Sequence, residues 1–407
     1  GGRLRAANSR LLTFVALAII APAVLVPAAA WGATTAGGWY HLKDGKLPSP
    51  GYTDVDFVTA TKGWAVGVDG TIAVTSNGGM TWRSQESGIS ADLASVAFSD
   101  PAHGWAVCES GILGTTDGGA NWNLLRSTTE DCLLRGIACT DASHAWAIGA
   151  DKATHAATIL STSDGGANWA KLGVSDVGQY PNNGLYGVTF LDASHGWAVG
   201  EGGTIVTTGD GGGIWTTQRA STAGQSRLKA VTFVDAFHGW AVGDGGTILF
   251  TTDGGTTWAR QDSWTTSSFA DVWFADASHG WAVGWDGISA TSNGGQDWKA
   301  QPLSFFVGPL QAITFANARC GWAVSCWGDV IVTYSAGAPD TRGPVTYARD
   351  ASGRRGKSIA LKYKITDNYC PRATAVKIVI RSGSRRVRTY SFPTKTTGVW
   401  HSVKWKP

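Results

Sequence analysis

Acidic residues recur at one position of a repeated pattern along this chain. Each lies in the turn after a Gly-Trp-Ala-Val segment or its close variant, and most are followed by one or two glycines. Two carboxylates across a cleft could hydrolyse a glycosidic bond, and a ring of carboxylates could attract a cation. Acid-glycine pairs are also ordinary hairpin-turn chemistry, so we interpret them as turn residues, with an acidic binding face as the alternative and no catalytic role. The acids are Asp69, Glu109, Asp151, Glu201, Asp244, Asp286 and Asp329.

Large aromatic residues gather near the last two of these turns. Two lie in the turns themselves and three in the loops that lead into the same repeats, so we expect them to converge beside Asp286 and Asp329. Exposed aromatics next to acids suit a peptide, a cationic segment or a sugar. The alternative is a local cap in which the rings pack on one another. The candidate binding aromatics are Trp264, Trp285, Phe305, Phe306 and Trp327.

Histidines also recur, in an Asp-x-x-His turn. They occupy the same turn in successive repeats, which spreads them apart, whereas metal ligands must converge on one ion. We therefore expect turn residues, with no metal and no cofactor. No Ser-His-Asp order, Gly-rich phosphate loop or Cys-x-x-Cys motif stands out. The histidines are His103, His144, His195, His238 and His279.

The repeat itself has a period near 41 residues. Its tryptophans are spaced by 41, 41, 51, 43, 41 and 41 residues. Each copy holds four short β-prone segments separated by turns, which is typical of an antiparallel sheet. Seven such units predict an all-β fold, a seven-bladed β-propeller of four-stranded blades over residues 38–335. The repeated tryptophans are Trp64, Trp105, Trp146, Trp197, Trp240, Trp281 and Trp322.

The seventh unit lacks an outermost strand of its own, because its third turn has lost most of the motif. Trp39 lies 25 residues before Trp64, much as Trp82 lies 23 residues before Trp105. We therefore expect Gly38–His41 to supply the missing strand, which leaves the ring without an open edge.

A second motif, Ser/Thr-x-Asp/Asn-Gly-Gly-x-x-Trp, follows most Gly-Trp strands. Asp or Asn and Gly form a tight turn, and the Trp covers the hairpin. The motif resembles the Asp-box, or bacterial neuraminidase repeat, which is a folding device. With the Gly-Trp-Ala-Val strand and the Asp-x-x-His-Gly-Trp turn, it makes residues 38–335 resemble the propellers of the photosystem II assembly and stability factors. Its copies end at Trp82, Trp122, Trp169, Trp215, Trp258 and Trp298.

That resemblance implies a non-enzymatic scaffold for a protein partner, such as a membrane protein under assembly. We expect the chain to be a monomer. Photosynthetic members of the family use an arginine-rich patch on one face. In residues 31–340 of this chain we expect the arginines to be scattered over different turns and strands. The alternatives are a carbohydrate-active Asp-box protein, either a glycoside hydrolase or a lectin, and a structural protein of the cell envelope. The arginines are Arg83, Arg126, Arg135, Arg219, Arg227, Arg260 and Arg319.

The chain also divides by charge. Residues 31–340 carry 14 Lys/Arg and 28 Asp/Glu, whereas residues 341–407 carry 16 and two. Residues 336–343 predict a linker. Residues 344–407 predict a small β-sandwich that resembles the immunoglobulin-like domain of flagellar hook-capping proteins, in a copy we expect to be incomplete. Its basic sheet face suits anionic lipid or cell-wall polymer, and no nucleic-acid motif is present.

Residues 1–30 have the order of a secretory signal peptide. Three arginines precede the apolar run Leu11–Ala30, which ends in small residues. A retained anchor is the alternative, since twenty residues can span a bilayer. We expect an exported protein that is extracellular, periplasmic or attached to the envelope. Export permits disulfide bonds, and we expect Cys132 and Cys139 as plausible partners.

Overall fold

The computed structural model describes residues 38–42, 47–48, 51–128, 132–172, 184–218, 226–303, 305–317 and 320–333, together with five strands beyond residue 340. Contacts divide the chain into two compact units, one over Trp31–Pro339 and one over Gly1–Ala30 with Asp340–Pro407. The predicted signal segment 1–30 and the linker 336–343 lie outside the described residues. Within those described ranges, no helix is long and apolar enough to cross a membrane.

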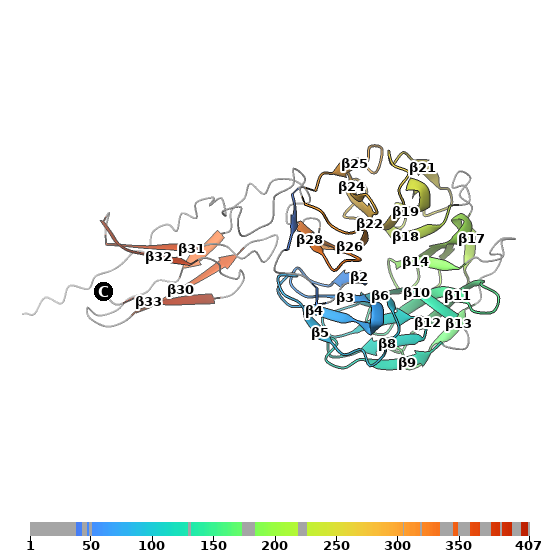
Figure 1. The fold of residues 1–407 in the computed structure, drawn as a ribbon, viewed down its shortest axis with the longest axis horizontal. Helices are drawn as coiled ribbons and strands as arrows, with labels where there is room; N and C mark the ends of the chain where they lie inside the picture. Colours follow the sequence, from blue (N-terminus) through green and yellow to red (C-terminus); the bar gives the residue numbers. More distant parts are fainter. Residues whose placement is uncertain are drawn as a thin grey trace, which may run out of the picture. The chain divides into compact units, whose positions relative to one another are not determined.

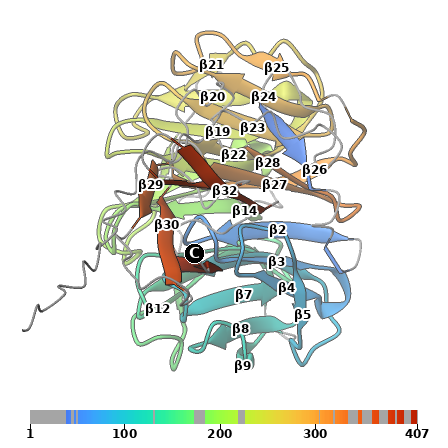
Figure 2. The same ribbon diagram turned by 90° about the vertical axis from the view of Figure 1, so that its left-hand side faces the viewer.

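The described residues of the unit Trp31–Pro339 form seven four-stranded antiparallel sheets around a central axis (Figure 1). This confirms the all-β, seven-bladed propeller that the repeat predicted. In blades 1 to 6 the strands follow one another outward in chain order, as β7, β8 and β9 do in Figure 2. The innermost strands of neighbouring blades pack side by side around the axis.

Blades 1 to 6 are built from consecutive strands. Blade 1 holds β2 (Tyr52–Phe57), β3 (Gly63–Gly67), β4 (Ile72–Thr75) and β5 (Arg83–Gln85). Blade 2 holds β6 (Leu93–Phe98), β7 (Gly104–Cys108), β8 (Gly111–Thr115) and β9 (Asn123–Ser127). Blade 3 holds β10 (Cys132–Cys139), β11 (Ala145–Asp151), β12 (Ala157–Thr162) and β13 (Ala170–Leu172).

Blade 4 holds β14 (Leu185–Phe190), β15 (Gly196–Gly200), β16 (Ile205–Thr208) and β17 (Thr216–Gln218). Blade 5 holds β18 (Leu228–Phe233), β19 (Gly239–Gly243), β20 (Ile248–Thr251) and β21 (Ala259–Gln261). Blade 6 holds β22 (Phe269–Phe274), β23 (Gly280–Gly284), β24 (Gly287–Thr291) and β25 (Lys299–Gln301). Short 3₁₀ turns follow the second strands of blades 1, 4 and 5, at η1 (Val68–Gly70), η2 (Glu201–Gly203) and η3 (Asp244–Gly246).

Blade 7 joins the two ends of the propeller. It holds β26 (Leu310–Asn317), β27 (Cys320–Ser325) and β28 (Val330–Thr333), and its outermost strand is β1 (Trp39–His41). β1 pairs antiparallel with β28, with Trp39 opposite Thr333 and His41 opposite Ile331. The prediction that Gly38–His41 closes the ring is therefore confirmed.

Aromatic rings join each blade to the next. Trp64 of blade 1 stacks on Phe98 of blade 2 with ring centroids 3.5 Å apart, and its indole N–H donates to the carbonyl of Gly118. Trp122 meets the same phenyl ring edge-on. A Cβ on Gly104 would clash with this ring, which explains the glycine before the repeated tryptophan. Equivalent stacks join Trp322 to Phe57, Trp146 to Phe190, Trp197 to Phe233 and Trp240 to Phe274.

Blade 3 departs from this pattern at two coupled positions. Cys139 stands where the other blades carry phenylalanine, and Ala145 stands where they carry the glycine. Without a ring above it, the position of Ala145 has room for a methyl group. Cys139 carries a free thiol, so the plausible pairing of Cys132 with Cys139 is wrong.

The direction of the chain assigns the connections to two faces. Loops leading into each blade and turns between second and third strands lie at one end of the innermost strands, and we call this side the loop face. The Asp-x-x-His turns and the Asp/Asn-Gly-Gly turns lie at the other end, the Gly-Gly face. Hydrogen bonds join the two turn types there, for example from the Gly118 N–H to the Ala102 carbonyl at 2.8 Å.

Five strands are described beyond residue 340. β29 (Val345–Ala348), β30 (Ile359–Thr366) and β33 (Trp400–Trp405) form one antiparallel sheet, and β31 (Val376–Ser382) and β32 (Arg385–Phe392) form a hairpin. The immunoglobulin-like sandwich and its basic face remain predictions.

Candidate binding face

Four aromatic side chains stand out from the loop face over blades 6 and 7. Trp285, between β23 and β24, is 74% exposed, and Trp327, between β27 and β28, is 52% exposed. Trp264 and Phe306, in the loops leading into these blades, are 75% and 83% exposed. Rings of this size usually bury most of their area. We call these four residues the aromatic patch.

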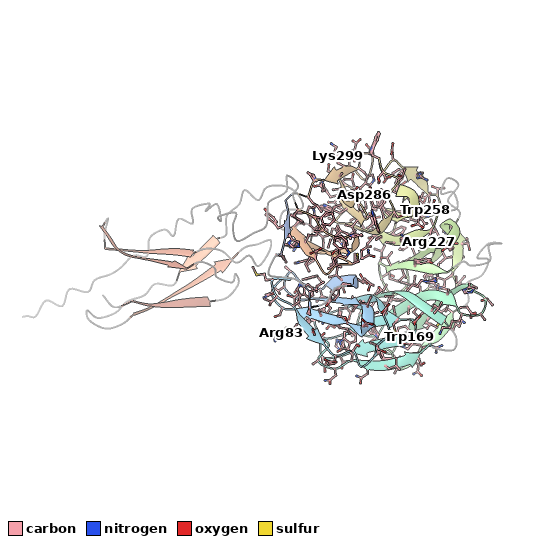
Figure 3. The ribbon with its side chains drawn as sticks, in the orientation of Figure 1. Arg83, Trp169, Arg227, Trp258, Asp286 and Lys299 are labelled. Carbon is pink, nitrogen blue, oxygen red and sulfur yellow. The ribbon has the colours of Figure 1, made fainter. Side chains whose placement is uncertain are left out.

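Hydrogen bonds hold Trp264 near the turn that carries Trp285. The Thr265 hydroxyl donates to Oδ2 of Asp286 at 2.9 Å, which ties the loop before blade 6 to the turn. Trp264 has a φ of 58°, in the left-handed region that non-glycine residues rarely adopt. Its N–H donates to Oδ1 of Asp262 at 2.9 Å. Asp286, labelled in Figure 3, thus follows Trp285 directly and is bonded to the residue after Trp264.

Phe306 and Trp327 form the other half of the patch. Their ring centroids lie 5.4 Å apart at an interplanar angle of 43°. Gly308 allows the indole to lie close to the loop, because a Cβ there would come within 2.6 Å of it. Both rings stay mostly exposed although they touch. The pair is therefore a surface feature rather than a closed cap.

Phe305 does not join the aromatic patch. It is half-buried, and its ring centroid lies 5.4 Å from that of His41 on β1. It packs against the core cluster that contains Trp39 and Phe315. Phe305 therefore supports ring closure, in place of the exposed position that the sequence predicted.

Asp329 is also structural. It is only 7% exposed, and it accepts hydrogen bonds from the Ser325 hydroxyl at 3.1 Å and the Gly308 N–H at 3.4 Å. His41 Nε2 lies 3.1 Å from its carboxylate. Burial acts to raise the pKa of Asp329, but the hydrogen bonds, led by that of His41, outweigh it and leave the pKa lowered. Asp329 fastens β1 to blade 7 and adds no exposed charge to the patch, contrary to our expectation.

The remaining turn acids do not form an uninterrupted negative ring. Three of the five lie close to a basic side chain that offsets their negative charge. This reduces the acidic face that was considered as an alternative. Asp69 and Glu109 lie in turns whose backbone bonds to Asp92 and Thr128. The ion pairs are Asp151 with Lys171 at 2.9 Å, Glu201 with Arg227 at 2.7 Å, and Asp244 with Lys229 at 2.8 Å.

A basic cluster at the mouth of the central channel was missed by our sequence analysis. The guanidinium carbons of Arg135 and Arg227 lie 4.4 and 5.0 Å from the ring centroid of Tyr186. Arg135, Tyr186 and Lys229 line a channel cavity of about 230 Å³. They occupy equivalent positions at the start of β10, β14 and β18, so aligning the repeats could have revealed them. Two of the arginines that we expected to be scattered are thus brought together (Arg227 is labelled in Figure 3).

Two half-buried carboxyl groups line the same channel. Asp54 accepts a hydrogen bond from the N–H of Val96 at 2.9 Å, and Asp271 from that of Ile313 at 2.8 Å. Burial raises the pKa of Asp54 to about 6 and that of Asp271 to about 7. A raised pKa suits a general acid, but each group bonds to the innermost strand of the next blade. We therefore assign them to joining blades, not to catalysis.

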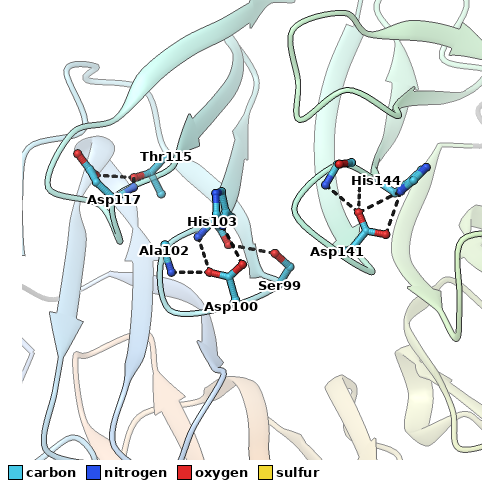
Figure 4. Close-up of polar contacts among 9 residues, drawn as sticks. Ser99, Asp100, Ala102, His103, Thr115, Asp117, Asp141 and His144 are labelled. Carbon is cyan, nitrogen blue, oxygen red and sulfur yellow. Dashed lines mark hydrogen bonds and ion pairs between the residues drawn. The ribbon is translucent and has the colours of Figure 1, made fainter.

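The repeated histidines are held within their own turns. His103 Nδ1 lies 2.8 Å from Asp100, which also accepts the backbone N–H groups of Ala102 and His103 (Figure 4). The same arrangement recurs at His144, His195, His238 and His279. In the described part of the chain, no group of three or more His, Cys, Asp or Glu could hold a metal ion.

A family model described as "Photosynthesis system II assembly factor YCF48" matches residues 46–129 and 175–263. The propeller resembles the YCF48 assembly factors. A structure entitled "YCF48 bound to D1 peptide" is 24% identical, with a TM-score of 0.59 over 73% of this chain and 96% of that one. YCF48 from Cyanidioschyzon merolae is 25% identical, with a TM-score of 0.59 over 73% and 98% of the two chains.

A structure of streptogramin B lyase shares the fold alone, at 15% identity and a TM-score of 0.59 over 72% of this chain and 97% of that one. No curated protein matches the chain. The YCF48 segments include Tyr186, Arg227 and Lys229 of the channel mouth. All four residues of the aromatic patch lie after residue 263 and so outside those segments.

Proposed function

We propose that this protein is an exported, non-enzymatic binding and assembly scaffold that holds a polypeptide segment of a partner protein on its loop face. The observation that carries the proposal is the exposure of the aromatic patch. The repeated tryptophans of the second strands are buried between blades, whereas Trp264, Trp285 and Trp327 are exposed. Exposed Trp and Phe side chains are the residue types that anchor protein interfaces.

The similarity to YCF48 supports a protein partner. One YCF48 structure contains a D1 peptide, and the matching family model describes an assembly factor. We therefore propose a membrane protein under assembly as the partner. Export is inferred from the predicted signal segment, so the two proteins would meet outside the cytoplasm.

The loop face offers two kinds of contact to such a segment. The aromatic patch over blades 6 and 7 offers apolar area next to the carboxylate of Asp286. The channel mouth offers Arg135 and Arg227 on the ring of Tyr186, with Arg227 also paired to Glu201. A polypeptide is the ligand class that can present apolar and charged side chains to both.

The test compares the wild-type chain with Trp285→Ala/Trp327→Ala and with the control Leu124→Ala, which removes an exposed apolar side chain from β9 of blade 2. Each protein is immobilised and offered solubilised envelope proteins of the host and, in parallel, a glycan array. We expect the wild type and the control to retain a membrane protein. The amount retained by the double variant should be lower by roughly tenfold or more. Equal retention by all three proteins, or glycan binding without protein capture, would contradict the proposal.

A further inference from the structure

The Gly-Gly face departs from the repeat in blade 4. The residue just before the motif tryptophan is polar in the other five copies, and its side chain bonds to the Asp or Asn of its own turn. In blade 4 this residue is Ile214, which is 62% exposed. Blade 4 thus lacks that bond and presents an apolar side chain to water. The polar residues are Thr81, Asn121, Asn168, Thr257 and Asp297.

Blade 5 departs at the neighbouring turn. The residue before the repeated histidine is small in the other copies of the Asp-x-x-His turn, but in blade 5 it is Phe237, which is 61% exposed. Its backbone makes the usual contact, since its carbonyl accepts the Gly254 N–H at 3.0 Å. The phenyl ring is therefore an addition to a turn that forms without it. The small residues are Ala102, Ser143, Ser194 and Ser278.

Ile214 lines a hollow between the two blades, and Phe237 lies beside it, since its carbonyl accepts the N–H of Gly254, which also lines the hollow. Ile214 of blade 4 and Ala236 of blade 5 both line a cavity of about 400 Å³, and Phe237 follows Ala236 directly. Trp197 and Gly254 also line it. Packing within the ring does not account for either side chain, because polar or small residues serve at the same positions in the other blades.

We propose that Ile214, Phe237 and the cavity beside them form a docking site for a cationic amphipathic segment of a partner polypeptide. The site lies on the face opposite the aromatic patch, so it is independent of the function proposed above. The apolar side chains would receive apolar residues of the segment, and their exposed area is of the kind that marks interaction surfaces.

Charge identifies the occupant. Asp210 lines the cavity together with His195. Asp192 and Asp235, which bind His195 and His238, lie in the adjacent Asp-x-x-His turns of blades 4 and 5. Hydrogen bonds, led by that from the Ile214 N–H, hold the pKa of Asp210 below its ordinary value, so it is ionised at neutral pH. In a second copy docking through the same face, these carboxylates would face the same carboxylates of the first copy, and the like charges would repel. An anionic membrane would be repelled as well. A segment with Lys or Arg between its apolar residues fits instead.

The test uses a variant that restores the residues of the other blades, Ile214→Thr/Phe237→Ser. Threonine precedes the motif tryptophan in blades 1 and 5, and serine precedes the histidine in blades 3, 4 and 6, so the thermal unfolding midpoint should be unchanged. The matched control is Leu124→Thr on blade 2. The probes are three synthetic peptides: one alternating Leu or Phe with Lys, one with Glu replacing Lys, and one with Ser replacing Leu and Phe.

Calorimetric titration of the full chain at physiological salt gives the outcome. We expect the Lys peptide to bind the wild type and Leu124→Thr with equal affinity and to bind the restored variant roughly tenfold more weakly. The Glu and Ser peptides should bind the wild type roughly tenfold more weakly than the Lys peptide does. Equal binding to the wild type and the restored variant overturns the proposal, as does loss of binding in Trp285→Ala/Trp327→Ala instead. A dimer in sedimentation that dissociates in the restored variant would assign the site to a second copy and also overturn it.

Discussion

Blades 2 and 3 occupy neighbouring places in the ring but fill the space between blades differently. In blade 2, Phe98 lies between two tryptophans and over Gly104. In blade 3, Cys139 replaces the phenyl ring and Ala145 replaces the glycine, and both blades still carry four strands. The comparison teaches that repeated aromatics and glycines of this chain are coupled parts of the core. Aromatics outside the repeat positions are then the ones that require another explanation.

The largest expected effect comes from truncating the last side chain of the first strand, which is Phe98 in blade 2 and Cys139 in blade 3. Phe98→Ala should lower the free energy of unfolding by about 3–5 kcal/mol, because it leaves a cavity between two indole rings. Cys139→Ala removes one sulfur atom, and we expect a loss of only about 1 kcal/mol. Urea unfolding of both variants measures the difference. Similar losses would show that blade 3 packs as tightly as blade 2 and would break the comparison.

The next effect is a pH dependence that distinguishes blade 1 from blade 2. Burial raises the pKa of Asp56 on β2 to about 7, whereas the equivalent residue of blade 2 is Ala97. Asp56 binds its proton more tightly when folded than when unfolded, so its stabilising contribution is full below pH 4 and is lost as the pH rises to 7. This amounts to about 1.4 kcal/mol for each pKa unit.

The contributions of Asp54 and Asp271 to stability change with pH in the same direction, because burial raises their pKa values to about 6 and about 7. We therefore expect the free energy of unfolding to fall between pH 4 and pH 7 and to change little above pH 7. Asp56→Asn should reduce that slope, and Leu124→Ala, at an exposed position on β9 of blade 2, should leave it in place. A stability that rises from pH 4 to pH 7 in both the wild type and Asp56→Asn would refute this account of the channel.

A smaller effect tests whether the ring and the glycine are coupled. Cys139→Phe should lower the free energy of unfolding by about 1–3 kcal/mol, because its ring would meet the methyl group of Ala145. Adding Ala145→Gly should recover most of that loss by restoring the arrangement of blade 2. The interaction energy from the double-mutant cycle measures the coupling. Additive effects would mean that the two departures of blade 3 are unrelated.

The smallest effect on stability belongs to the aromatic patch. Trp285→Ala/Trp327→Ala should change the free energy of unfolding by less than about 1 kcal/mol, since both indoles are more than half exposed. The matching change inside the ring, Trp64→Ala, should cost several times more. Comparable losses from the two variants would make the patch part of the core.

The sequence predicted the ring because the repeat is local and redundant. Six copies of the turn motif, six Gly-Trp strands and the Ala-Trp strand of blade 3 all indicate the same unit. The spacing of Trp39 before Trp64 placed the closing strand correctly. The strong spacing of these motifs also explains the confirmed resemblance to YCF48.

The surface could be predicted only in part, since neighbours in sequence can have opposite environments. Phe305 is half-buried and Phe306 is exposed, although both lie in one loop. Asp286 and Asp329 occupy the same turn position, but His41, 288 residues away in the chain, covers only Asp329. The gathering of Arg135 and Arg227 around Tyr186 likewise depends on three separate strands or loops. Such contacts follow from how the ring closes and not from local pattern.

The central claim is that the aromatic patch, lying outside the repeat, is where a partner polypeptide binds. Site-specific photo-crosslinking tests it directly, with a photoreactive phenylalanine analogue at position 285 and, as the control, at position 124. Each chain is expressed in the host and irradiated, and adducts are identified by mass spectrometry. The account predicts a crosslinked envelope polypeptide from position 285 and none from position 124. The same adducts from both positions, or none from position 285 while the protein folds normally, would contradict it.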